Sequence, residues 1–101
     1  MVQFQPFHVG KLVFKSKAEF VRRCKEAIHK GSIDSVMSGE DEVLAEAIFN
    51  TRLDKVSELN GRSVLRYWRK PHKFNTVSFW AEMSDGEFLD FSFMKLTLPL
   101  R

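Results

Sequence analysis

The fold class is decided by residues 76–96, TVSFWAEMSDGEFLDFSFMKL. Apolar and polar residues alternate on both sides of Ser84-Asp85-Gly86, and an Asp-Gly pair between two strand-like runs is a strong signal for a β-hairpin. We therefore expect one strand over Thr76–Met83 and another over Glu87–Leu98, joined by this turn.

A further strand is predicted just upstream, over residues 63–70, because the same two-residue period continues there. Pro71 should end it, since proline has no N–H group to donate to the strand ladder. The C-terminal part of the chain is thus expected to form a three-stranded antiparallel meander.

The N-terminal half carries helical signals after one short strand, predicted over residues 9–14. Ser16-Lys17-Ala18-Glu19 is a capping box, so a helix should begin at Lys17. A candidate stop is Gly31. The apolar side chains of this helix follow a period near 3.6 and are Phe20, Val21, Cys24, Ala27 and Ile28.

A second helix is expected after the candidate cap Ser38, and its acidic first turn, residues 40–42, suits the positive end of the helix dipole. Apolar residues at a spacing of three within residues 53–59 predict one more short turn. We therefore expect an α+β domain spanning residues 1–101, with an N-terminal strand, two helices, and then the meander, the helices packed on one face of the sheet.

Composition limits the function classes. A chain of 101 residues with 44% hydrophobic content and ten Phe residues suits one compact domain. It contains no apolar run near the roughly 20 residues that span a bilayer, no secretory signal, and a single cysteine, Cys24. These features predict a soluble, cytoplasmic, monomeric protein with no membrane association.

The segment RSVLRYWRKPHKF, residues 62–74, contains five basic and no acidic side chains in a chain of net charge +3. Basic groups pair with phosphate and aromatic rings stack on unpaired bases, so this segment predicts a nucleic-acid contact, with RNA preferred over DNA. The residues expected to make that contact are Arg62, Arg66, Trp68, Arg69, Lys70 and Lys73.

Two simpler interpretations remain open for this segment. The aromatic side chain of Tyr67 or Trp68 can face the core while the charges are ordinary solvated surface, and basic residues on an edge strand deter unwanted pairing. If about five cations did contact single-stranded RNA, the log-log dependence of binding on salt would have a slope of roughly −3 to −4.

No pattern predicts catalysis, a metal ion or another cofactor. Asp90 interrupts an apolar strand, and we expect it to pair with a basic side chain or with backbone N–H groups, because no second carboxylate or histidine is placed beside it by a recognisable spacing. Cys24 and His29 lie on different faces of the first helix and therefore cannot share a zinc ion. Cys24 is on the apolar stripe and is expected in the core.

Several motifs resemble those of the defective chloroplasts and leaves (DCL) family, over residues 12–97. The matching positions are Phe14, Ser16, Lys55, Gly61, Phe79, Trp80, Asp85, Gly86, Asp90, Phe91, Ser92 and Lys95. Plant relatives are linked to the maturation of chloroplast ribosomal RNA and occur as a tail on an RNA polymerase subunit, so the resemblance implies an RNA-related role without established catalytic residues.

The alternative function is a protein interaction module. Such a module would dock on a larger assembly such as an RNA polymerase or a ribosome-associated protein, through either the acidic second helix or exposed aromatic side chains.

Overall fold

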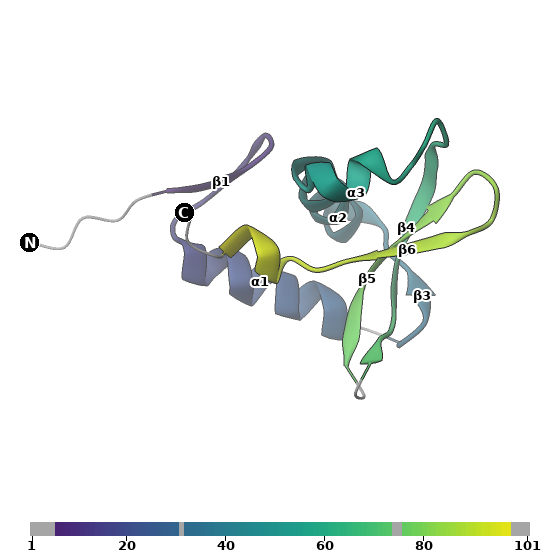
Figure 1. The fold of residues 1–101 in the computed structure, drawn as a ribbon. Helices are drawn as coiled ribbons and strands as arrows, with labels where there is room; N and C mark the ends of the chain where they lie inside the picture. The colour runs from purple at the N-terminus through teal and green to yellow at the C-terminus, as the bar shows by residue number, and fades with distance from the viewer. Residues whose placement is uncertain (1–5, 31, 74–75, 98–101) are drawn as a thin grey trace, which may run out of the picture.

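The computed structural model describes residues 6–30, 32–73 and 76–97. These residues form two sheets and three α-helices (Figure 1). Along the chain the elements are β1 (Phe7–Val9), β2 (Leu12–Phe14), α1 (Lys17–His29), β3 (Ser35–Val36), α2 (Gly39–Thr51), α3 (Leu53–Ser57), β4 (Val64–Pro71), β5 (Val77–Met83), β6 (Phe88–Phe91) and the 3-10 turn η2 (Met94–Thr97). The expected α+β class is confirmed.

The main sheet has four antiparallel strands in the order β3-β4-β5-β6. The meander predicted from the Asp-Gly turn forms three of these strands, β4-β5-β6. Gly86 at the turn has a φ of 90°, a value that glycine adopts without strain. β3 is not among the strands predicted from the sequence. This two-residue strand pairs with β4 through Ser35↔Arg69 and Val36↔Trp68.

The predicted N-terminal strand over residues 9–14 is wrong in detail, since the segment turns at Gly10 and forms the β1–β2 hairpin. Gly10 is the first of the two turn residues and has a φ of 59°. Two-residue hairpin turns with glycine at the first position require a positive φ there. A Cβ atom there would lie 3.8 Å from Ala47 of α2, which places the tip of the hairpin against that helix.

The final strand is also shorter than expected. β6 ends at Phe91, where the prediction extended it to Leu98, a residue outside the described ranges. Arg52 donates a hydrogen bond of 2.8 Å to the carbonyl of Ser92, and the Ser92 hydroxyl accepts one from the backbone of Met94. These bonds lead the chain out of the sheet and into η2.

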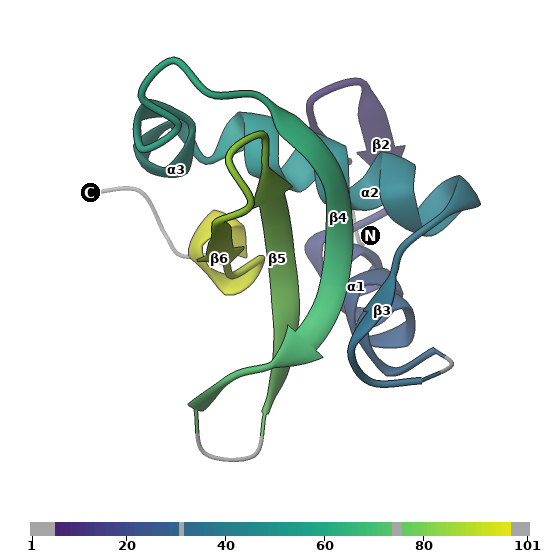
Figure 2. The same cartoon turned by 90° about the vertical axis from the view of Figure 1, so that its right-hand side faces the viewer.

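Both long helices pack on one face of the four-stranded sheet, as predicted (Figure 2). The Ser16 hydroxyl caps α1 by accepting from the Glu19 N–H at 3.2 Å, whereas Ser38 precedes α2 without such a bond. The predicted stop at Gly31 lies outside the described residues. Phenylalanine rings fill the layer between helices and sheet, and the stacked rings of Phe79 and Phe91 have their centroids 5.5 Å apart.

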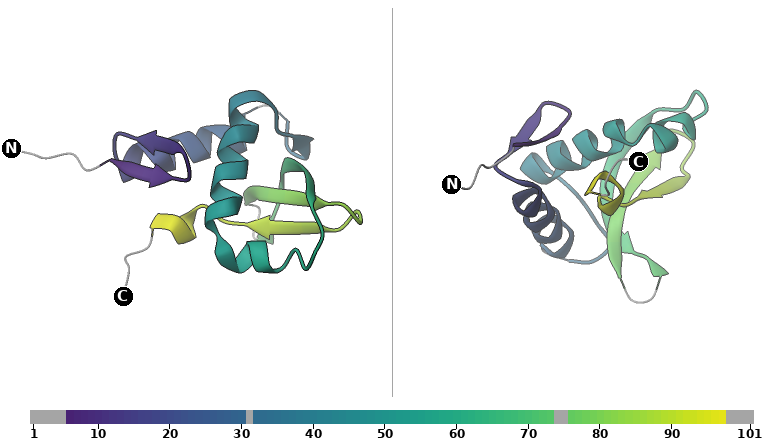
Figure 3. Two further views of the ribbon diagram at one scale, coloured as in Figure 1. Left: turned by 90° about the horizontal axis from the view of Figure 1, so that it is seen from above. Right: turned by 60° about the vertical axis from the view of Figure 1, so that its left-hand side comes forward.

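The hairpin is a second layer of its own, lying over the start of α1 and against α2, away from the sheet (Figure 3). In the described ranges, no helix is long and apolar enough to cross a membrane.

Candidate interaction surface

β4 divides its side chains between two very different environments. Tyr67 and Arg69 point towards the helices and are 6% and 7% exposed, whereas Trp68 and Lys70 point to the opposite face. Burial raises the pKa of the Tyr67 hydroxyl to about 12, and nearby Glu46 adds to this effect. The sequence predicted that side chains alternate along β4, but it did not predict which face of the strand meets the core.

Arg69 is a structural residue, so its predicted place on a nucleic-acid surface is wrong. Its guanidinium donates to the Ala27 carbonyl at 2.9 Å, to the Ser35 hydroxyl at 2.8 Å and to the Asp41 carboxylate at 3.2 Å. Ala27 is in the last turn of α1, where helix carbonyls lack partners within the helix. Arg69 thus joins α1, β3 and the start of α2, and Asp41 is needed as its buried counter-ion.

Three of the other predicted cations are held by carboxylates. Arg62 contacts Asp85 at 2.9 Å and Glu87 at 2.6 Å, both in the turn between β5 and β6. The hydrogen bond from the Glu87 backbone and the Arg62 guanidinium both lower the pKa of Asp85, while Asp85 and Glu87 raise the pKa of Arg62.

Arg66 and Lys70 are neutralised on the outward face of the sheet. Arg66 forms a forked pair with Glu82 across the strands, at 2.6 and 3.1 Å, and Trp68 donates its indole N–H to the same carboxylate at 2.9 Å. The Arg66 bond and then the Trp68 bond lower the pKa of Glu82. Lys70 pairs with Asp34. Of the six predicted residues, Lys73 alone is an exposed cation with no ion pair to another residue in the described ranges.

The aromatic rings of this face already contact groups within the chain. Trp68 and Phe88 meet edge to face at 5.8 Å, and the Lys70 ammonium lies 4.9 Å from the first ring and 4.8 Å from the second. A base that stacked on Trp68 would have to compete with this ammonium.

Asp90 occupies a polar corner of the same face, beside Trp80. Its carboxylate contacts His72 Nε2 at 2.9 Å and Lys55 Nζ at 4.0 Å, which matches the structural pairing expected for it. The His72 ring lies 5.7 Å from that of Trp80, whose buried indole N–H has no hydrogen-bond partner among the described residues.

The apolar character of this outward face was not expected. Val36, Trp68 and Trp80 follow one another across three strands, and Phe88 lies beside Trp68. Val36 and Phe88 remain 41% and 38% exposed, and both long helices pack on the other face of the sheet (Figure 2). The sequence signal for this apolar face was the alternation of Trp80 and Phe88 with residues that lie in the core. We call this set, with Lys70 and Glu82, the outer sheet face.

The excess of positive charge lies elsewhere. Residues 6–30, which form the hairpin and α1, carry seven basic and two acidic side chains, and α1 packs on the opposite side of the sheet. Lys11, Lys15 and Lys25 are exposed and form no ion pair with a described residue, while Arg22 and Arg23 share Glu26.

Residue types that hold metals or act as nucleophiles are dispersed. In the part of the chain that the structure describes, no three His, Cys, Asp or Glu side chains gather into a metal-binding group. Cys24 is fully buried, as expected, and burial raises the pKa of its thiol to about 12, so the reactive thiolate is suppressed.

Comparison with protein families found no family that matches the chain, and comparison with curated proteins found no similar sequence. The fold is similar to that of an uncharacterized protein from Rhodospirillum rubrum solved by solution NMR. The TM-score is 0.80 and the identity 22%, with 97% of this chain and 93% of that one covered. This likeness confirms the α+β fold and carries no information about activity.

Proposed function

We propose that the chain is a non-catalytic protein interaction module and that the outer sheet face is its docking surface. One observation carries this proposal: Val36, Trp68 and Phe88 form an uncovered apolar centre, and the charged groups around it are paired. Protein interfaces combine an aromatic centre depleted in unpaired charge with a polar rim. Docking on an RNA polymerase or a ribosome-associated protein is the expected setting.

A capture experiment tests the proposal. The wild-type protein and a Phe88→Glu variant are immobilised and exposed to extract of the source organism with and without ribonuclease, and the bound proteins are identified and purified for direct titration. Ala18→Glu is the matched control, because Ala18 is exposed on α1, on the other side of the sheet.

Direct binding of a purified partner to the wild type and to the Ala18→Glu variant, with at least tenfold weaker binding to the Phe88→Glu variant, supports the proposal. A partner whose affinity is unchanged by Phe88→Glu places the contact elsewhere and overturns it, as does a requirement for RNA in every capture.

A second candidate function, binding of single-stranded RNA, is favoured by the positive hairpin and α1 instead of β4. If Lys11, Lys15 and Lys25 contact phosphates, the log-log salt slope should be roughly −2. A filter-binding titration at two salt concentrations tests this. Loss of binding in a Lys15→Ala, Lys25→Ala double variant supports the hairpin and α1, whereas loss only in an Arg66→Ala, Lys70→Ala double variant restores the β4 hypothesis. No binding at low salt removes RNA as a ligand.

A further inference from the structure

The strand β2 has an unpaired edge. β1 and β2 form a separate two-stranded sheet, paired through Phe7↔Phe14, His8↔Val13 and Val9↔Leu12. Hydrogen-bonded and non-hydrogen-bonded pairs alternate along antiparallel strands, and the pair that closes a two-residue turn is hydrogen-bonded. The N–H and C=O of Val13 therefore point away from β1, and within the described ranges the Val13 backbone forms no hydrogen bond to a turn, a loop or another element.

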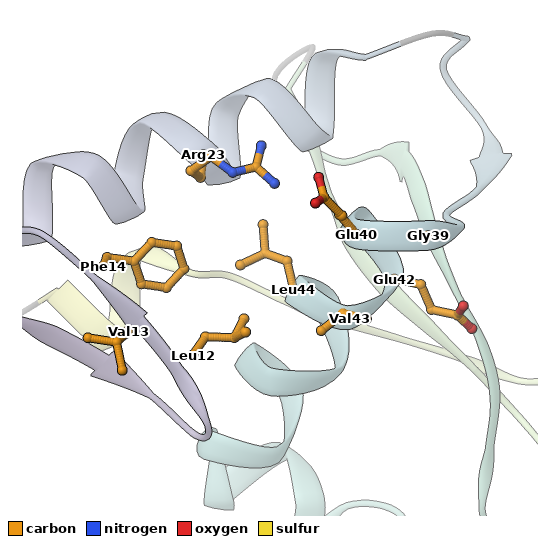
Figure 4. A pocket seen from close by; sticks show the side chains of 9 residues that line it. All are labelled: Leu12, Val13, Phe14, Arg23, Gly39, Glu40, Glu42, Val43 and Leu44. Carbon is orange, nitrogen blue, oxygen red and sulfur yellow. The ribbon is translucent and has the colours of Figure 1, made fainter.

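A groove follows this edge. Its cavity of about 740 Å³ is lined by all three residues of β2 and by none of β1, so it lies on the unpaired side of β2 (Figure 4). α1 contributes Arg23, and the first part of α2 closes the other side. A smaller cavity of about 370 Å³ continues around the hairpin tip and shares Leu12 and Val43 with the first.

The groove combines an apolar floor with an acidic wall. Leu12, Phe14 and Leu44 point towards one another from β2 and α2 (Figure 4). Val13 and Val43 are 61% and 51% exposed at the rim.

The acidic wall consists of carboxylates along α2. Glu40 and Glu42 line the larger cavity and Glu46 the smaller, and none of the three forms an ion pair with a residue of the described ranges. Arg23, the basic residue of the larger cavity, already contacts Glu26 at 3.2 Å. The groove therefore offers unpaired negative charge to an occupant.

We propose that the free edge of β2 accepts an extended segment of a partner protein as a third strand, and that this segment alternates aliphatic and basic side chains. An added strand would satisfy the Val13 backbone, and its side chains would point alternately to opposite faces. The aliphatic ones lie on the face that Leu12 shares with Leu44, and the basic ones lie on the exposed face with Val13, from which their long side chains extend to Glu40 and Glu42 at the rim. This site is separate from the outer sheet face and does not depend on it.

The probe is a capped peptide of eight residues, Thr-Lys-Val-Lys-Val-Lys-Val-Thr, titrated into ¹⁵N-labelled protein. The expected result is saturable change in the amide signals of the groove, with slowed hydrogen exchange at the Val13 amide. A peptide with Glu in place of Lys has the same pattern and opposite charge, and should bind at least tenfold more weakly. Equal binding of both peptides, no binding of the first, or changes centred on Phe88 would overturn the proposal.

Variants separate the two parts of the proposal. The Glu40→Gln, Glu42→Gln double variant should weaken the Lys peptide about fivefold, because each exposed ion pair contributes only a modest free energy. Glu58→Gln, which changes an exposed carboxylate at the end of α3 outside the groove, should leave affinity unchanged. If both variants bind like the wild type, the acidic wall has no role.

Val13→Pro removes the backbone donor at the edge, while Val13→Ala shortens the side chain and keeps the N–H. The proline variant should lose binding and the alanine variant should lose less than threefold. Equal affinities in these two variants, both with a native amide spectrum, would rule out strand addition. The Phe88→Glu variant should bind the peptide normally, so failure here and failure of the sheet-face proposal are distinguishable.

Discussion

We expect the Arg69→Met substitution to lower the free energy of unfolding by about 3–5 kcal/mol, the cost of removing one partner of a buried ion pair. Arg69 and Asp41 are 7% and 5% exposed. Methionine fills the space of the aliphatic part of the arginine side chain but forms none of its three hydrogen bonds. Among the residues that the structure describes, Asp41 would then keep only the Lys30 ammonium as a cationic partner, 3.7 Å away on a side chain that is mostly in solvent. A buried carboxylate would be left poorly compensated.

The assay is urea unfolding followed by tryptophan fluorescence and circular dichroism. Arg66→Met is the matched control, since its ion pair is on the outer face with Arg66 half exposed, and it should cost less than about 1 kcal/mol. An Arg69→Met, Asp41→Leu double variant should recover most of the loss, because both charges leave the interior together. If Arg69→Met costs no more than Arg66→Met, the structural role assigned to Arg69 is refuted.

Three other predictions concern single residues. The hydrogen bond from Arg52 lowers the pKa of Asp54 to about 2. The stability that this ion pair adds is therefore present above the ordinary Asp pKa near 4 and is lost as the pH falls towards 2. Asp54→Asn should lower the free energy of unfolding at pH 7 and change it little at pH 2, as measured by urea unfolding at both pH values. Cys24 should resist a thiol reagent at pH 8 in the folded protein and react fully in urea, and rapid native labelling would contradict its burial. Gly86→Ala should destabilise the protein by about 1 kcal/mol or more and Gly86→Asn by less, in thermal unfolding, because the turn requires positive φ; equal stability of the wild type and the alanine variant would contradict that turn.

Local patterns predicted the elements whose signals lie within a few residues. The cap formed by the Ser16 hydroxyl and the Asp-Gly turn at Gly86 are both found as expected, because each is a contact between neighbours in the chain. The alternation along β4 correctly separated Tyr67 from Trp68. An exception within β4 is Leu65, which is 53% exposed next to a register shift that interrupts the alternation.

The missed elements depend on partners distant in sequence. β3 is two residues long and has no periodicity of its own, and it is ordered by the strand across from it: Asp34 donates its N–H to the Arg69 carbonyl, and Met37 donates to that of Tyr67. The hairpin was missed because Val9 and Leu12 are both apolar, so a continuous strand and a tight turn at Gly10 share the same pattern.

The same limit applies to the charge count that led to the predicted nucleic-acid contact. Five cations in thirteen residues give a large local charge, but the carboxylates that neutralise four of them come from distant segments. Glu82 is 16 residues from Arg66, and Asp34 is 36 residues from Lys70. A count of charged residues along the chain therefore describes the electrostatic field of an extended peptide, and not that of the folded surface.

Pairing of this kind changes which ligand the outer sheet face can accept. A phosphate that bound Arg66 would have to displace the forked contact of Glu82, and the released carboxylate would remain beside the phosphate and repel it. The exchange at Lys70 would leave Asp34 in the same position and would also remove the ammonium from the rings of Trp68 and Phe88. A protein partner has no such requirement, because it can cover Val36 and Phe88 while the ion pairs stay intact at the edge of the contact. The intramolecular pairs thus favour an apolar, uncharged contact over a polyanion at this face, and the Phe88→Glu variant is the substitution that should affect such a contact most directly.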